Sequence, residues 1–181
     1  SDRLVYEESD DSFYMGLSRT RSERFICITL ESTLSSEQRV APAADPAQFT
    51  VFAERASDIE YDADHLGGRW VIRTNWNAPN YRLMALADGM PIGGRSGWQD
   101  FIAHRDDVFI EDFELFDGFT AIEERSNALL RIRTLGADGR SEFVASDEPA
   151  YAMGLSVNAE AGSEWLRYSY TSLTTPNTVY E

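Results

Sequence analysis

The sequence of 181 residues has no lysine, a single cysteine, two histidines and no long hydrophobic run. Because Cys27 stands alone, an intramolecular disulfide and a zinc site built from cysteines are excluded. No segment approaches the roughly 18 apolar residues of a membrane helix, so we expect no membrane span. The first residues hold no basic segment leading into an apolar core, so we expect no signal peptide in the sequence as given. A lone cysteine fits a reducing compartment, which makes the cytoplasm the expected location and the periplasm the alternative.

Positive charge is also scarce. Sixteen basic residues, all arginine, face 31 acidic ones, and the formal net charge is −15. A field of this sign repels nucleic acid and favours cationic partners, although simple solubility is the plainer interpretation. The hydrophobic content of 43%, with 12% aromatic residues, is that of a folded protein.

The stretch from Ile59 to Ala87 shows how the rest of the chain is built. It predicts three strands, at 59–65, 70–76 and 81–87, joined by turns that contain Gly67-Gly68 and Asn77-Ala78-Pro79-Asn80. In the middle strand, Trp70, Ile72, Thr74 and Trp76 share one face.

This pattern recurs about every 45–50 residues. Four strands can be aligned on their first aromatic residue, namely Phe25, Trp70, Phe119 and Trp165. A four-stranded unit repeated at this length indicates a β-propeller, whereas a Greek-key sandwich would not repeat in this way. We therefore predict an all-β fold, a β-propeller fragment of about four blades, each a four-stranded antiparallel meander.

The repeats also predict how residues 1–181 are divided. Complete blades are expected at 12–54, 59–104 and 108–146, an incomplete blade at 151–181, and an orphan outer strand at 4–8. Unpaired strand edges promote association. We expect the isolated chain either to close on itself, with 4–8 completing the last blade, or to self-associate.

Three groups of residues invite a catalytic interpretation. Gly93-Gly94-Arg95-Ser96-Gly97 resembles a G-x-S-x-G nucleophile elbow, but Trp98 stands in place of the second glycine and no helical pattern follows, so a loop is predicted. Asp62, Asp64 and His65 offer metal-ligand types, but a strand would place His65 on the face opposite the two aspartates. We expect His65 to cap the turn at Gly67-Gly68.

Paired acids form the third group. They occur at Glu7-Glu8, Asp106-Asp107 and Glu123-Glu124. A glycosidase needs two carboxylates facing one sugar, whereas neighbours on a strand point to opposite faces. The four tryptophans, Trp70, Trp76, Trp98 and Trp165, are more typical of packing between blades than of a sugar platform. The residues by themselves assign no catalytic, cofactor-binding or metal site.

Four segments resemble a known family. They are VYEESDDSFYMGLSRTRSERFICI, IEYDADHLGGRWVIRTN, FDGFTAIEERSNALLRIR and LRYSYTSLTTPNTVYE, and they are similar to the propeller of the bacterial oligopeptidase B group of the prolyl oligopeptidase family of serine peptidases. The closing phrase, with Thr174-Thr175-Pro176, is the most specific. The similarity runs through nearly the whole sequence, in order and in phase with the repeats.

The resemblance implies a seven-bladed propeller that covers an α/β-hydrolase domain. In that family a Ser-Asp-His triad in the hydrolase domain cleaves short peptides after Arg or Lys without a metal, and the propeller excludes large proteins. This sequence holds about four blades and none of the family's catalytic residues. The implied partners are therefore the hydrolase domain and short basic peptides, and the segment alone should be inactive.

Two other functions stay open at this point. A propeller could serve only to bind proteins, with no enzyme attached, and a glycosidase is a more distant alternative. A G-x-S-x-G elbow in a strand–helix setting after Glu181 would favour the peptidase, whereas further blade repeats would favour the binding scaffold.

Overall fold

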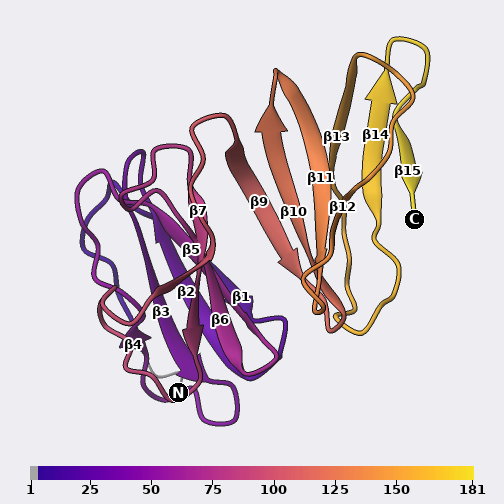
Figure 1. The fold of residues 1–181 in the computed structure, drawn as a ribbon. Helices are drawn as coiled ribbons and strands as arrows, with labels where there is room; N and C mark the ends of the chain where they lie inside the picture. The colour runs from indigo at the N-terminus through magenta and orange to yellow at the C-terminus, as the bar shows by residue number, and fades with distance from the viewer. Residues whose placement is uncertain (1–3) are drawn as a thin grey trace. The chain divides into compact units, whose positions relative to one another are not determined.

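The computed structural model describes residues 4–181, and regular structure in this part of the chain consists of fifteen β-strands (Figure 1). The first two groups of strands are β1 (Tyr14–Arg19), β2 (Phe25–Glu31), β3 (Ser36–Pro42) and β4 (Thr50–Val51), then β5 (Tyr61–Leu66), β6 (Arg69–Thr74), β7 (Arg82–Ala87) and β8 (Gln99–Ile102). They are followed by β9 (Phe109–Leu115), β10 (Phe119–Ser126), β11 (Leu129–Gly136) and β12 (Ser141–Phe143), and last by β13 (Tyr151–Leu155), β14 (Tyr168–Ser172) and β15 (Thr178–Tyr180).

These strands form four antiparallel sheets. Three have four strands, in the orders β1-β2-β3-β4, β5-β6-β7-β8 and β9-β10-β11-β12, and the fourth has the order β13-β14-β15. Every strand pairs with its neighbour in sequence, so each sheet is a meander. The predicted units 12–54, 59–104 and 108–146 each contain one four-stranded sheet, and 151–181 contains the three-stranded one.

The chain divides into two compact units. The first comprises Ser1–Ala78 with Arg82–Ala103, and the second comprises Pro79–Tyr81 with His104–Glu181. Each unit therefore contains two of the four sheets.

A tight turn sets the register of the second sheet. Gly67 and Gly68 join β5 to β6 with φ of 61° and 77°, values that side chains with a Cβ adopt only at a cost. Two successive residues with positive φ suit the two-residue turns whose twist matches that of the flanking strands. The turn pairs Leu66 with Arg69, and Tyr61 with Thr74 at the far end.

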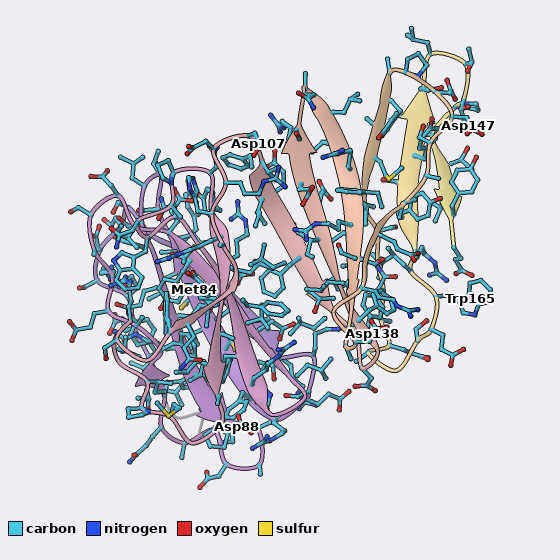
Figure 2. All side chains as sticks on the ribbon, in the orientation of Figure 1. Met84, Asp88, Asp107, Asp138, Asp147 and Trp165 are labelled. Atoms are coloured by element: carbon cyan, nitrogen blue, oxygen red, sulfur yellow. The ribbon has the colours of Figure 1, made fainter. Side chains whose placement is uncertain are left out.

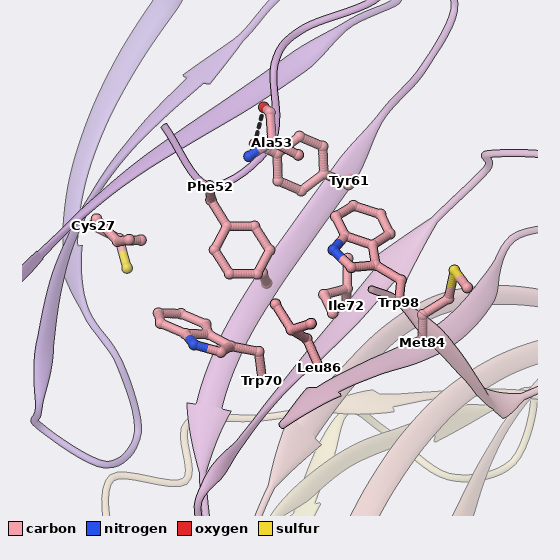
Figure 3. Packing of buried hydrophobic residues seen from close by; sticks show 11 residues of the cluster. Cys27, Phe52, Ala53, Tyr61, Trp70, Ile72, Met84, Leu86 and Trp98 are labelled. Carbon is pink, nitrogen blue, oxygen red and sulfur yellow. Dashed lines mark hydrogen bonds between the residues drawn. The ribbon is translucent and has the colours of Figure 1, made fainter. Parts of the chain in front are cut away.

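The core of the first unit lies between its two sheets (Figure 3). Phe52 is fully buried beside Trp70, with ring centroids 4.8 Å apart, and Trp98 packs near both Phe52 and Tyr61. Burial of each such side chain contributes roughly 1.5–3 kcal/mol. The predicted packing role of Trp70, Trp76 and Trp98 is confirmed, since Trp76 also lies against this cluster.

The core of the second unit is smaller. Ile132, Met153 and Tyr170 are its buried members, and they come from β11, β13 and β14. The Tyr170 ring stacks on Tyr151 with centroids 5.6 Å apart. The last two sheets of the chain therefore meet through β11 and the strands β13 and β14.

Two strand predictions were wrong. Residues 4–8 form no strand, because side chains rather than backbone hydrogen bonds hold this segment: Glu8 accepts hydrogen bonds from Tyr6 and Arg55. The strand predicted to begin at Trp165 begins at Tyr168, since residues 156–167 form a long loop. The outer strands β4, β8 and β12 are short, at two to four residues.

Candidate functional site

The glycine-rich segment 93–97 is a loop between β7 and β8, as predicted. Gly93 has φ of 103° and donates its backbone N–H to the carbonyl of Phe52 at 2.8 Å. The Arg95 guanidinium donates to the carbonyl of Glu54 at 2.8 Å. No helix follows the exposed Ser96. The segment therefore ties the outer edges of the first two sheets together and has none of the geometry of a nucleophile elbow.

The Asp62-Asp64-His65 cluster is divided as the strand period predicts. Along β5, Tyr61, Ala63 and His65 are buried, while Asp62 and Asp64 lie on the other face. Among the described residues, no group of three or more His, Cys, Asp and Glu side chains has an arrangement that could hold a metal ion. We find no ligand set at this position.

His65 does not cap the Gly67-Gly68 turn, so that prediction was wrong. Its ring is fully buried and lies between two other side chains: Nδ1 is 2.7 Å from Ser22 Oγ, and Nε2 is 2.7 Å from Asp88 Oδ1. Arg24 donates to the second oxygen of Asp88 at 2.6 Å. The imidazole thus joins the first sheet to the turn after β7.

These contacts bring together a serine, a histidine and an aspartate, the residue types of a hydrolase triad. Here the hydroxyl is already engaged: Ser22 Oγ accepts the backbone N–H of Arg24 and lies 3.1 Å from Thr20 Oγ1. A triad requires a nucleophile that can reach a substrate and donors for the developing oxyanion. The buried ring leaves no approach to its nitrogens, so the arrangement serves to hold structure.

Burial and hydrogen bonds act in opposite directions on the two aspartates near His65. Burial is the largest influence on Asp88, but hydrogen bonds from Arg24 and His65 outweigh it and lower the pKa of this carboxyl. For Asp64, burial prevails and raises the pKa, although the backbone N–H groups of Arg21 and His65 donate to the carboxylate.

The rest of β5 continues this connection along the first sheet. Tyr61 Oη accepts the backbone N–H of Gln38 at 2.7 Å and donates to the carbonyl of Ala53 at 2.7 Å. The Gln38 side chain in turn donates to Asp62 and accepts from the backbone of Ala63, both at 2.8 Å. We call the contacts of Tyr61–His65 with the first sheet the β5 seam. Its hydrogen bonds satisfy polar groups that burial would otherwise leave unpaired.

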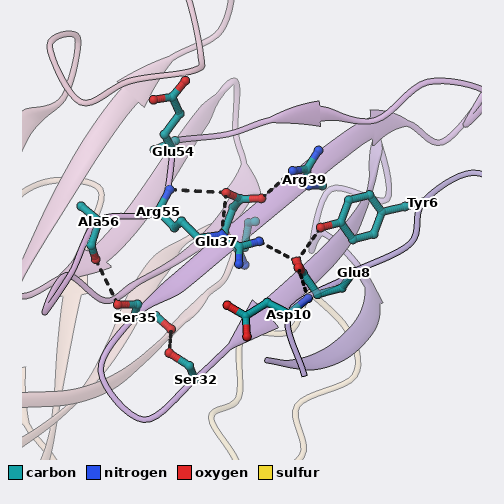
Figure 4. Close-up of polar contacts among 12 residues, drawn as sticks. Tyr6, Glu8, Asp10, Ser32, Ser35, Glu37, Arg39, Glu54, Arg55 and Ala56 are labelled. Atoms are coloured by element: carbon teal, nitrogen blue, oxygen red, sulfur yellow. Dashed lines mark hydrogen bonds and ion pairs between the residues drawn. The ribbon is translucent and has the colours of Figure 1, made fainter. Parts of the chain in front are cut away.

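In the first acid pair, an arginine holds Glu8 in place (Figure 4). Glu8 accepts from Arg55 at 2.6 Å, and the same guanidinium reaches the buried Glu37 at 3.3 Å. Arg39 pairs with Glu37 at 2.9 Å and lies over the Tyr6 ring at 4.3 Å. This network fixes the amino-terminal segment on the first sheet, which explains why 4–8 keeps a definite place without forming a strand.

The other two acid pairs do not converge either. Asp107 is bound by Arg105 at 2.6 Å, while Asp106 is fully exposed. Glu123 accepts the backbone N–H of Leu155 at 2.8 Å, and burial raises the pKa of this carboxyl. Glu124 points to the opposite face of β10.

The buried Glu124 carboxylate lies 2.9 Å from Arg133 and 3.5 Å from Arg131. Because Glu123 and Glu124 engage different partners on opposite faces, they offer no pair of carboxylates that face one sugar.

Sequence reasoning missed the loop between β13 and β14. It spans residues 156–167, whereas the equivalent connections are 20–24, 67–68 and 116–118. A cavity of about 270 Å³ lies against it, lined by side chains that include Val157, Glu160, Trp165, Arg167 and Glu181. We call this cavity the 156–167 hollow.

Trp165 is 68% exposed, and Figure 2 shows its ring pointing away from the strands of its sheet. The prediction that this tryptophan packs between blades was therefore wrong. The run of small and polar residues Asn158–Glu164 between two predicted strands, with a glycine at 162, was the available sign of a long loop.

The sequence of this chain matches a family of known propeller domains. The sequence profile of the prolyl oligopeptidase N-terminal beta-propeller domain matches residues 1–181. The chain belongs to the prolyl oligopeptidase family. The four meander sheets are thus propeller sheets, and the predicted all-β propeller fold is confirmed.

Two curated relatives carry the names of peptidases. Dipeptidyl aminopeptidase BI of Pseudoxanthomonas mexicana is 59% identical over 181 residues, which cover 99% of this chain and 25% of the relative. Protease 2 of Moraxella lacunata is 26% identical, and the match covers 99% of this chain and 26% of that protein. The chain therefore spans about a quarter of the length of these family members.

Solved structures agree on the fold. Oligopeptidase B from Leishmania major matches with a TM-score of 0.87 at 24% identity, and the match covers 96% of this chain and 26% of that one. Oligopeptidase B from Trypanosoma brucei also gives a TM-score of 0.87, at 23% identity over 97% of this chain and 26% of that one. The predicted resemblance to the oligopeptidase B group is confirmed.

The remaining structural finding concerns membranes. Within residues 4–181, no helix has the length and apolar character needed to cross a bilayer.

Proposed function

We propose that this chain is a non-catalytic part of the propeller of a serine peptidase, and that it limits which substrates reach an active site in a C-terminal α/β-hydrolase domain. The observation that carries the proposal is the match of the whole chain to the family's N-terminal propeller. The proposal that this part is non-catalytic is supported by Ser22, His65 and Asp88. These side chains resemble catalytic groups, but they bind one another and hold the structure at and beside the β5 seam.

For the full-length protein we propose cleavage of short peptides after Arg or Lys. The support is the resemblance to the oligopeptidase B group, together with the net charge of −15, which would attract cationic peptides. Steering of this kind weakens as salt screens the charges. The location proposed for the protein is the cytoplasm, on the basis of the lone Cys27.

The direct test uses full-length protein and an amino-terminally blocked Arg-aminomethylcoumarin substrate. We expect cleavage that a serine-directed reagent abolishes. We also expect kcat/KM for basic peptides to fall more steeply with salt than kcat/KM for neutral ones. Activity that withstands the reagent would contradict the serine mechanism, and equal salt slopes would reduce the acidic charge to a solubility role.

A separate experiment tests the limit on substrate size. A short peptide and an unfolded protein that carries the same cleavage sequence are compared as substrates of the full-length protein. We expect the short peptide to be strongly preferred, and we expect His65→Ala, which breaks the link between Ser22 and Asp88, to weaken that preference. Equal cleavage of both substrates by the wild type would refute a filtering role.

A second candidate activity is the release of dipeptides from a free amino end. It is favoured by the name of the relative that is 59% identical, dipeptidyl aminopeptidase BI. The blocked substrate distinguishes the two activities, because an aminopeptidase requires the free amine and would cleave only an unblocked dipeptidyl-aminomethylcoumarin.

The two alternatives drawn from the sequence have less support. A propeller that only binds proteins is disfavoured by relatives whose names denote peptidases. A glycosidase is disfavoured because Trp70 and Trp98 are buried in the core of the first unit, where they cannot stack on a sugar.

A further inference from the structure

The 156–167 hollow is bounded by a loop that is fixed at several points. The buried Asn158 side chain donates to Glu114 of β9 at 2.7 Å and to the carbonyl of Arg167 at 3.0 Å. Its oxygen accepts the backbone N–H of Arg167 at 2.6 Å. The Asn158 amide therefore closes the neck of the loop and ties it to the neighbouring sheet.

Two further contacts hold the tip. The backbone N–H of Asp117 donates to the carbonyl of Ala161 at 2.9 Å. Ser163 Oγ accepts the backbone N–H of Trp165 at 3.0 Å and donates to its carbonyl at 2.9 Å. Trp165 is thus an exposed ring on a restrained backbone, so little conformational freedom is lost when a ligand binds to it.

The charges around the hollow leave one carboxylate available. Arg167 is paired with Glu181, so these two lining residues neutralise each other. Within the described residues, the exposed Glu160 carboxylate has neither a hydrogen bond nor an ion pair. An aromatic face next to a free carboxylate is the combination that attracts a cation.

We propose that the 156–167 hollow binds a positively charged side chain, a guanidinium or an ammonium group, of a peptide. The cation would stack on Trp165 and pair with Glu160, while Val157, which is 75% exposed, would contact the aliphatic stem. Only the choice of a peptide as the ligand rests on the proposed function. The site would add affinity for basic residues that are remote from the bond being cleaved.

Direct binding tests the proposal in full-length protein. The probe is a fluorescein-labelled, amide-capped peptide, Gly-Gly-Arg-Gly-Gly, and its control is the same peptide with citrulline, the neutral isostere of arginine. Binding is followed by fluorescence anisotropy at low ionic strength, and mass spectrometry confirms that the peptide stays intact. We expect the arginine peptide to bind about fivefold to tenfold more tightly than the citrulline peptide.

Variants then locate the site. Trp165→Ala and Glu160→Gln should each reduce the preference for arginine to less than about twofold, whereas Trp165→Phe should retain most of it. Glu164→Gln is the matched control, because it removes an exposed carboxylate of the same loop that does not line the hollow. Circular dichroism melting verifies that each variant is folded.

The binding and cleavage results together distinguish the cation site from the proposed peptidase function. Equal binding of the two peptides by the wild type, or a preference that survives in both Trp165→Ala and Glu160→Gln, would overturn the proposal. Cleavage of Arg-aminomethylcoumarin by the same preparation is measured separately. If cleavage fails while the preference persists in the wild type and is lost in the variants, the proposed peptidase function is refuted and the cation site stands.

Discussion

At the scale of single residues, the main feature of this chain is its buried polar groups, which hydrogen-bond to the backbone. Tyr61 is 3% exposed, and its hydroxyl satisfies the backbone of Gln38 and of Ala53 at once. Burial is also the main cause that raises the pKa of Tyr61 to about 12, so the hydroxyl remains protonated at physiological pH.

Replacement of Tyr61 by Phe should therefore be costly despite the small change in volume. The backbone N–H of Gln38 and the carbonyl of Ala53 would lose their partner while still buried, at a cost of about 1–3 kcal/mol. Urea unfolding of the 181-residue chain measures the loss. Tyr14→Phe is the control, since Tyr14 is 84% exposed and should give no measurable change.

Glu8 predicts how stability depends on pH. Hydrogen bonds from Tyr6 and Arg55, and then from the backbone of Asp10, lower the pKa of Glu8 from 4.5 to about 2. A carboxyl with a depressed pKa stabilises the fold fully above its unfolded pKa, and this contribution is lost as pH falls through the folded pKa. For Glu8 the loss lies between about pH 4.5 and pH 2.

Glu8→Gln should consequently lower the urea midpoint at pH 7 and make it less sensitive to acid between pH 4.5 and pH 2. Glu7→Gln, which alters an exposed neighbour, should behave like the wild type. An unchanged acid profile in Glu8→Gln would show that the hydrogen bonds to Tyr6 and Arg55 do not stabilise the carboxylate.

At the scale of the strands and turns, glycines in equivalent turns have different requirements. Gly68 in the β5–β6 turn has φ of 77°, whereas Gly118 in the β9–β10 turn is not among the glycines with positive φ. A Cβ added at either position would meet no atom within 4 Å. An alanine methyl group should therefore affect stability differently at these two sites only because the backbone conformation differs.

We expect Gly68→Ala to destabilise the chain by about 1 kcal/mol or more, because alanine disfavours the left-handed region. Gly118→Ala should be neutral or slightly stabilising, since it reduces the entropy of the unfolded chain. Thermal or urea unfolding of the two variants side by side is the measurement, and equal effects would contradict the assigned turn geometry.

The strands themselves were largely predictable, because alternation of apolar residues marks each half-buried strand. The central strands β2, β6 and β10 begin at or within one residue of the predicted aromatic positions. The pattern failed at Trp165, where an exposed aromatic ring resembles the first residue of a buried strand in sequence alone. It failed at 4–8 for a related reason, since that segment has strand-like composition but is held by side chains.

The functional groups were less predictable than the strands. The separation of Asp62 and Asp64 from His65 follows from the two-residue period of a strand. The partners of His65 do not, because Ser22 and Asp88 are distant in sequence and meet only through tertiary packing. The 156–167 hollow likewise depends on Glu114 of β9 and Asp117 of the β9–β10 turn, which are distant in sequence.

At the scale of the whole chain, the open edge of the first sheet should govern association. All six residues of β1 are exposed, including Tyr14, Met15 and Leu17, and β1 pairs only with β2. An exposed apolar edge strand favours pairing with another chain. We expect the 181-residue chain to self-associate at high protein concentration.

Leu17→Lys should weaken this association, so that roughly tenfold more protein is needed to populate the oligomer, equivalent to about 1.4 kcal/mol. Analytical ultracentrifugation over a concentration series measures the shift. Leu173→Lys is the control, since Leu173 is 97% exposed but lies in a turn rather than at a strand edge. A monomer at every concentration would rule out association through β1.

The buried Cys27 can report local opening of the structure through its chemical reactivity. Its side chain belongs to the core between the first two sheets, and burial raises the pKa of the thiol to about 12, so in the closed structure it should resist alkylation. Cys27 is the only thiol in the sequence. The rate at which an alkylating reagent modifies it in native buffer therefore reports how often those two sheets separate. Local opening of this propeller segment can therefore be measured without an engineered label.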